Sequence, residues 1–138
     1  MQISKQRKIE IMIFIILIII GSAFYLNFKN LHIKFYNKTG KDIDSLVIAG
    51  TFIENLKNGN STEYIDYKEF LFDSGIPYEQ ISGIVNKKKI SQLNWSDCGT
   101  ERNLQSEGSY IFDLKKAEDE KGNTCLYLTN HNEKVFFE

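Results

Sequence analysis

The chain has 138 residues with 17 basic and 18 acidic side chains, and its formal net charge of −1 excludes the strongly basic surface that nucleic-acid binding requires. Once an N-terminal apolar segment is set aside, about 110 residues are left, which is the size of one domain. A single proline argues against a flexible Pro-rich linker, and the abundance of Ile, Lys and Asn is typical of an AT-rich bacterial genome.

Residues 11–20 form the run IMIFIILIII, which contains no charged or hydrogen-bonding side chain. Extended to residues 9–28, the segment reaches the roughly 20 residues that a helix needs to cross a bilayer core. Glu10 and Asn27 then lie near the two ends, where a polar group costs far less than at the midplane. The sequence therefore predicts a transmembrane helix with the lipid bilayer as its partner, preceded by a short basic cytoplasmic tail over residues 1–8.

A cleaved signal peptide is the alternative for this segment. Three basic residues precede the apolar run, and the small residues 21–23 (Gly-Ser-Ala) offer a cleavage site after Ala23. The run is at the upper length limit for a signal peptide, so an uncleaved anchor is favoured. Lysines lie on both sides of the span, but a long following domain translocates largely irrespective of charge. We therefore expect a single-pass protein of the cytoplasmic (inner) membrane with an extracytoplasmic domain over residues 29–138; cleavage near Ala23 would secrete that domain.

Strand-like segments follow the apolar run, joined by turns rich in Asn, Gly and Asp. Residues 31–36 alternate strictly, which places Leu31, Ile33 and Phe35 on one face of a half-buried strand. Asn58-Gly59 predicts a type I′ hairpin between the strands on either side of it. The remaining predicted strands are residues 43–49, 51–56, 62–72 (with a short helix as the alternative), 80–85, 89–93, 108–115, 124–129 and 134–137.

The spacing of these strands defines the expected fold class. Short strands at intervals of roughly 8–12 residues predict an all-β domain. Its expected architecture is an antiparallel β-sandwich, immunoglobulin-like or transthyretin-like, preceded by the single N-terminal transmembrane helix. The analogy concerns architecture alone and implies no shared function.

Cys98 and Cys125 are the only cysteines. An even number of cysteines in a domain expected outside the cytosol favours one disulfide between them, worth roughly 3–4 kcal/mol for a loop of about 28 residues. Two unpaired thiols are the alternative, and a cysteine nucleophile would need His131 as its base. Trp95, beside Cys98, either packs on the disulfide or serves as an exposed binding contact, and packing is favoured.

The other polar groups predict no site. His32 and His131 lack the spacing to carboxylates that metal ligands show. The acidic residues 118–120 lack the alternating oxygen ligands of a calcium loop. The lysines at 87–89 are typical of a soluble hairpin tip or strand edge, with a contact to anionic lipid headgroups or to acidic glycans as the less favoured interpretation. With no phosphate loop, nucleophile elbow or carboxylate pair in the sequence, we expect no catalytic residue, no metal ligand and no cofactor.

These observations favour a tethered, non-catalytic binding or structural module with an envelope protein as its partner, because anchoring raises the effective concentration near a membrane partner. The alternative is an exported hydrolase whose site is assembled from residues far apart in sequence. A deep polar pocket with converging titratable groups would favour the enzyme, and a flat aromatic patch on one sheet would favour binding.

Overall fold

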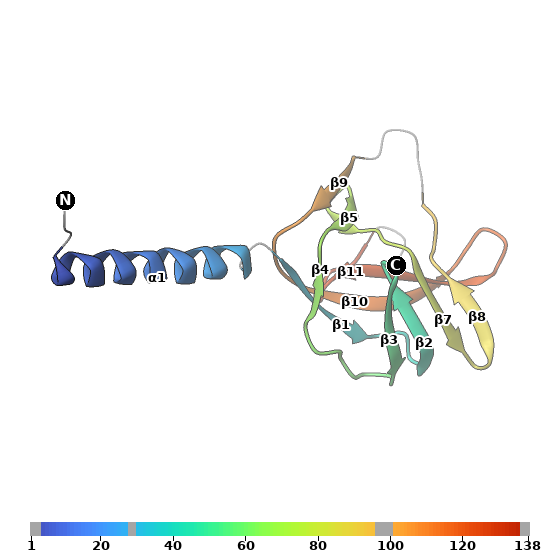
Figure 1. Ribbon diagram of the computed structural model, residues 1–138. Coiled ribbons are helices and arrows are strands. Elements are labelled where there is room, and N and C mark those ends of the chain that lie inside the picture. Colours follow the sequence, from blue (N-terminus) through green and yellow to red (C-terminus); the bar gives the residue numbers. More distant parts are fainter. Residues whose placement is uncertain (1–3, 28–29, 96–100, 136–138) are drawn as a thin grey trace.

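The computed structural model describes residues 4–27, 30–95 and 101–135. Within these ranges the chain forms one helix, α1 (Lys5–Asn27), which lies apart from the strands (Figure 1). Ser4 caps it, because its Oγ accepts a hydrogen bond from the backbone N–H of Arg7 at 3.4 Å. The helix is long and apolar enough to cross a membrane and none of its apolar window is buried, properties that an anchor and a signal sequence share. The predicted span is thus the apolar part of a longer helix, except for residue 28, which lies outside the described residues.

The strands of the described residues form three sheets, whose arrangement can be followed in Figure 1. Sheet A contains, in spatial order, β11 (Thr124–Asn130), β10 (Gly108–Glu118), β1 (Leu31–Asn37) and β4 (Ile65–Tyr67). Sheet B contains β3 (Thr51–Leu56), β2 (Ile43–Ile48), β7 (Ile81–Val85) and β8 (Lys88–Ser91). Sheet C contains β6 (Ile76–Pro77), β5 (Phe70–Asp73) and β9 (Arg102–Gln105). A β-rich domain after one apolar helix is therefore confirmed.

One pair of strands departs from the expected antiparallel arrangement. Strands β1 and β10 run parallel, with Leu31 opposite Gly108 and Asn37 opposite Leu114. The other pairs of named strands in the described residues are antiparallel. Parallel neighbours need a long connection, and here the chain between β1 and β10 supplies it by building β4 and the other two sheets.

The hairpin predicted at Asn58-Gly59 is wrong, because the strands on either side of this turn do not pair with each other. A turn forms there, but β3 pairs with β2 in sheet B, whereas β4 pairs with β1 in sheet A. Residues 57–64 therefore cross from one sheet to the other. Asn37 fixes this crossing: it is fully buried, and its Nδ2 donates hydrogen bonds of 2.8 Å to the backbone carbonyls of Leu56 and Lys41.

Two further predictions need correction. Residues 62–72 form strand and not helix, but as two short pieces, β4 and β5, that belong to different sheets. The predicted strand at 134–137 is wrong for Lys134 and Val135, because the chain turns away from the sheet edge at Asn132, whose φ is 61°. Residues 136–138 lie outside the described residues.

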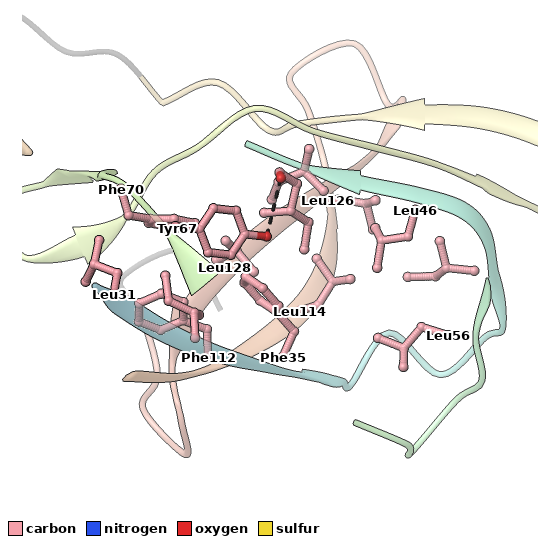
Figure 2. Close-up of a cluster of buried hydrophobic side chains, with 14 of the residues drawn as sticks. Leu31, Phe35, Leu46, Leu56, Tyr67, Phe70, Phe112, Leu114, Leu126 and Leu128 are labelled. Atoms are coloured by element: carbon pink, nitrogen blue, oxygen red, sulfur yellow. Dashed lines mark hydrogen bonds between the residues drawn. The ribbon is translucent and has the colours of Figure 1, made fainter. Parts of the chain in front are cut away.

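Buried side chains from all three sheets form one hydrophobic core. Figure 2 shows its aromatic centre, where the rings of Phe35, Phe70 and Phe112 meet. Their centroids lie 5.5–6.3 Å apart in tilted arrangements, a spacing that aromatic pairs prefer. Leu46 and Leu56 of sheet B extend the same core with aliphatic side chains.

Gly83 lies on β7 facing the core, where this strand passes close to β2. A Cβ atom placed on Gly83 would lie 2.6 Å from Cγ2 of Ile43, a methyl carbon held close to the backbone. We therefore expect Gly83→Ala to lower the free energy of unfolding by about 1–3 kcal/mol through overpacking. Thermal unfolding of the full chain in detergent micelles, followed by near-UV circular dichroism, measures the change. Ser82→Ala, at the outward-facing neighbour, is the control, and an equal effect of both substitutions would contradict the prediction.

Tyr67 joins sheet A to sheet B. Its hydroxyl donates a hydrogen bond of 3.4 Å to the backbone carbonyl of Ile48 (dashed line in Figure 2). Burial raises the pKa of Tyr67 from 10.0 to about 12, because the phenolate loses its hydration inside the protein. The unfolded chain therefore ionises at a lower pH than the folded one. The stability that this group contributes is complete below the unfolded pKa and is lost as the pH rises from about 10 to about 12.

Tyr67→Phe tests this alkaline destabilisation. We expect the native chain to lose on the order of 2 kcal/mol more of its unfolding free energy than Tyr67→Phe between about pH 9 and about pH 11.5. Urea unfolding at both pH values measures the difference. Tyr64→Phe, at an exposed tyrosine, is the control and should behave like the native chain. Equal losses in the native chain and in Tyr67→Phe would show that another group titrates.

Candidate functional site

One row of side chains crosses the outer face of sheet B. The register places Phe52 opposite Val47, Val47 opposite Ser82, and Ser82 opposite Ser91. These positions alternate along their strands with buried side chains such as Ile48, so the row points away from the core. Three strand spacings make the row roughly 14 Å long.

The polar half of this row lies in a shallow hollow of about 360 Å³, which we call the sheet B hollow. Its apolar lining includes Val47 and Ile81, and Lys89 is its one cationic side chain. The rest of its side-chain lining is polar and uncharged, and comes from Gln80, Ser82, Ser91, Gln92 and Asn94.

A bulge in β2 shapes this face. Ser45 adopts a φ of 49°, and the register of β2 shifts against both β3 and β7 around it. The Ser45 N–H donates a 3.1 Å hydrogen bond to Oδ1 of Asn55, which holds the irregularity in place. Because a bulge bends its strand and increases the local twist, the face of sheet B curves just before Val47 enters the hollow.

Most polar side chains of the sheet B hollow are left without a protein partner. In the described part of the chain, the side chains of Gln80, Ser82, Ser91 and Gln92 make no hydrogen bond to another residue. Asn94 differs, because its Oδ1 accepts a hydrogen bond of 3.3 Å from a tyrosine hydroxyl. Amides and hydroxyls both donate and accept, so the hollow offers both kinds of group to a ligand.

Trp95, which the sequence singles out, lies where the chain leaves the hollow. The Leu93 N–H donates to the carbonyl of Leu126 at 2.7 Å, which carries the chain from sheet B to β11. The half-buried Trp95 packs edge-on against Tyr78, with ring centroids 4.6 Å apart. Arg102 lies over the same Tyr78 ring at 5.1 Å. Trp95 thus has a packing partner within the domain, and its role as a ligand contact stays a prediction.

Cys125 lies in β11 and is half-buried. Its thiol forms no disulfide within the described residues, and its predicted partner Cys98 lies outside them, so the disulfide stays a prediction. Burial raises the pKa of the Cys125 thiol, and the negative charge of Asp119 acts in the same direction. Because the thiolate is the nucleophilic form, this environment disfavours Cys125 as a nucleophile.

Each histidine lies beside an aspartate. Asp113 of β10 is only 2% exposed; its Oδ1 lies 2.7 Å from Nδ1 of His131, and its Oδ2 accepts the Asn132 N–H at 2.9 Å. Tyr36 stacks on the His131 ring with centroids 4.8 Å apart. His32 similarly pairs with an exposed aspartate on the neighbouring strand β4. Sequence reasoning missed both pairs, because each partner lies far away along the chain.

A third acidic group joins β5 to β9. Asp73 is 1% exposed, and its Oδ2 lies 3.5 Å from Nε of Arg102, the residue opposite it in the sheet. Its Oδ1 accepts a hydrogen bond of 3.3 Å from the hydroxyl of Ser74. Removing the arginine would leave a buried carboxylate unpaired, which is strongly unfavourable. The pair therefore links β5 to β9 in addition to their backbone pairing.

Other charged groups have structural roles. Among the described residues, no group of three or more His, Cys, Asp or Glu side chains is placed to hold a metal ion. In the acidic run, Oδ1 of Asp119 accepts the N–H groups of Lys121 and Asn123 at 2.9 and 2.8 Å and shapes the turn between β10 and β11. The hydrogen bond from the Asn123 side chain lowers the pKa of Asp119. Residues 86 and 87 form the β7–β8 turn, at positive φ values of 50° and 63°.

Comparison with protein family models, with curated proteins and with solved structures gives no match for this chain. Its own geometry is therefore the basis for a functional proposal. Of the features described above, the sheet B hollow is the one where most of the hydrogen-bonding side chains make no hydrogen bond within the described residues.

Proposed function

We propose that this chain is a single-pass protein of the bacterial cytoplasmic membrane that displays a non-catalytic β-sandwich binding module on the extracytoplasmic side. The apolar helix α1 supports the membrane part, and basic residues stand at its N-terminal end. The length of the following domain supports its translocation. A binding module gains from such an anchor, because tethering raises its effective concentration near a membrane partner.

The shared core supports a two-layer architecture. Phe35 and Leu128 of sheet A and Leu46 and Ile48 of sheet B belong to one buried cluster, as expected when two sheets pack face to face. The parallel β1–β10 pair departs from the two antiparallel sheets of the immunoglobulin fold. We therefore propose a two-sheet sandwich with sheet C as an addition, and no closer assignment.

The sheet B hollow carries the proposal of a binding role. Apart from Asn94, its amide and hydroxyl side chains have no partners in the described part of the domain, and they gather on one face instead of being scattered over the surface. A ligand that satisfies them gains hydrogen bonds without breaking any within the protein. The surface is shallow and mostly uncharged, which favours recognition over catalysis.

Site-specific photo-crosslinking in native membranes tests this function. A photoreactive residue at Ser91, inside the hollow, is expected to give a reproducible adduct with an envelope component. The same residue at Lys116, an exposed position on β10, is the matched control and should give none. Absence of an adduct from position 91, or equal adducts from both positions, would contradict a binding role for this face.

The exported hydrolase is the second candidate, and the His131–Asp113 pair is the observation that favours it. A buried carboxylate that orients a histidine is half of a general-base arrangement. If the protein were a hydrolase of this kind, turnover of an ester and peptide substrate panel would be abolished by His131→Gln. Turnover that depends on His131 would replace the binding proposal, and no turnover by the native chain would exclude this candidate.

Secretion of the β domain is the remaining alternative for the N-terminal segment. The intact mass of the protein recovered from the membrane fraction and from the surrounding medium decides between the two. An uncleaved anchor gives the full mass of 16.0 kDa. A product that lacks residues 1–23 would show cleavage after Ala23 and a secreted domain.

A further inference from the structure

We propose that the sheet B hollow binds an acidic oligosaccharide. This inference rests on the proposed function, since it names the ligand class of the same binding face. It follows from three features of the hollow: its unpartnered amides and hydroxyls, its single unpaired cation, and the apolar side chains in the same row.

The uncharged polar side chains set the class of ligand. Gln80 and Gln92 each offer two N–H donors and one carbonyl acceptor, and Ser82 and Ser91 each offer a hydroxyl that donates and accepts. A ligand that complements this mixture must itself donate and accept at closely spaced positions, as the neighbouring hydroxyl groups of a sugar do. An apolar ligand would bury these groups unpaired, at a cost of about 1–3 kcal/mol each.

Lys89 sets the charge of the ligand. Among the described residues it makes no ion pair, and the acidic side chain in its row, Asp44, is separated from it by Ile84. Two strand spacings put that carboxylate roughly 10 Å away. The ammonium group is therefore free to meet a carboxylate or phosphate on the sugar. Lys87 and Lys88 precede Lys89 in the same hairpin and add positive charge near it.

The apolar part of the row fits the ring faces of a sugar. Val47 lies in the hollow, and Phe52, which is 62% exposed, follows it toward the edge of sheet B. The C–H groups on one face of a pyranose ring can pack on such side chains while its hydroxyls reach the serines and glutamines. A row of roughly 14 Å spans more than one sugar ring.

The same features disfavour the other macromolecular ligands. A specific protein interface has an apolar centre with buried aromatic or arginine anchors, whereas most side chains that line this hollow are hydroxyls and amides and none is aromatic or arginine. Nucleic-acid binding depends on neutralising several phosphates, and one lysine lines the hollow. An acidic oligosaccharide needs one cation and many hydrogen bonds, which is what the hollow offers.

Isothermal titration calorimetry on the full chain in lipid nanodiscs tests the proposal. The probes are a tetrasaccharide of hexuronic acid and the matched neutral tetrasaccharide whose carboxyl groups have been reduced to alcohols. We expect both to bind, and the acidic one to bind about tenfold more tightly, because it alone forms a charge-assisted bond with Lys89.

Three variants locate the binding. Lys89→Gln is expected to remove the tenfold preference for the acidic probe and leave the affinity for the neutral one unchanged. Ser82→Val combined with Ser91→Val is expected to weaken both probes about 30-fold through two lost hydrogen bonds. Valine suits a strand position, and near-UV circular dichroism and thermal unfolding check that this variant keeps its fold. Lys116→Gln, on sheet A, is the control and should leave both affinities unchanged.

The outcomes separate this inference from the function on which it rests. No binding of either probe up to its solubility limit, or binding that the two serine substitutions leave unchanged, would overturn the saccharide proposal. If position 91 crosslinks to an envelope protein while neither probe binds, the binding module stands and the ligand class is wrong. If position 91 gives no adduct and neither probe binds, both proposals fail.

Discussion

Phe112→Ala is expected to lower the free energy of unfolding by about 3–5 kcal/mol, because a fully buried phenyl ring is lost and a cavity is left behind. Phe112 lies on β10, in the interior of sheet A, and its ring contacts those of Phe35, Phe70 and Phe72 at centroid distances of 5.5–6.1 Å. The ring thus connects sheet A with sheet C. For a domain whose total stability is about 5–15 kcal/mol, this loss is a large fraction.

Thermal unfolding of the full chain in nanodiscs, followed by near-UV circular dichroism, measures this effect. A loss of this size corresponds to a fall in Tm of about 15 °C or more. Phe52→Ala is the matched control, because the same ring is removed from an exposed position and should cost less than about 0.5 kcal/mol. If the two alanine variants unfolded at the same temperature, the assignment of Phe112 to the core would be wrong.

The second large effect is expected in the helix. Ile15→Arg combined with Ile18→Arg places two guanidinium groups near the middle of α1, where each costs about 2.5–3.5 kcal/mol for insertion into a bilayer. The sum of about 5–7 kcal/mol offsets the roughly 3–6 kcal/mol that the remaining isoleucine, leucine and phenylalanine side chains of α1 supply at about 0.3–0.6 kcal/mol each. We therefore expect the variant to leave the membrane fraction.

Alkaline carbonate extraction of membranes measures this change. The native chain should stay in the pellet, and the double arginine variant should appear in the supernatant or be degraded. Ile15→Leu combined with Ile18→Leu keeps the segment apolar and is the control that should stay in the pellet. Release of the native chain by carbonate would show that α1 does not span a bilayer.

Sequence reasoning correctly predicted the strands that can be recognised from a few consecutive residues. In β1, strict alternation placed Leu31, Ile33 and Phe35 on one face, and all three are fully buried. The β7–β8 hairpin was also predicted, because its turn residues separate two short apolar strands. Such patterns report which side chains avoid water, and they carry no information about which strand lies alongside.

Sequence reasoning therefore failed to predict which strands pair with each other in the sheets. Nothing in residues 31–37 indicates that β1 pairs with β10 in parallel, because that contact is selected by the packing of the whole core. The Asn58-Gly59 turn suggested a local hairpin, but the buried amide of Asn37 binds the carbonyl of Leu56 and directs the crossing between sheets. The neighbours of Asn37 in the sequence do not reveal this role, because its partner Leu56 lies nineteen positions further on.

The sheet B hollow was likewise invisible in the sequence. Ser82 and Ser91 are ordinary outward-facing residues on their own strands, and Phe52 is an ordinary exposed aromatic. The register of β3, β2, β7 and β8 brings them into one row, and the bulge at Ser45 curves the face that they share. Trp95 was singled out from its neighbours in sequence, and the structure places it against Tyr78 near this row.

The proposed display of the β domain outside the membrane is tested most directly by labelling intact spheroplasts with a membrane-impermeant maleimide. Cys98 and Cys125 are first replaced by serine, and one new cysteine is introduced as Lys88→Cys at the exposed β7–β8 hairpin or as Lys5→Cys at the start of α1. We predict that position 88 is labelled in intact spheroplasts and position 5 only after detergent is added. Labelling of position 5 in intact spheroplasts, with position 88 protected until the membrane is dissolved, would contradict an anchored domain displayed outside the cell membrane.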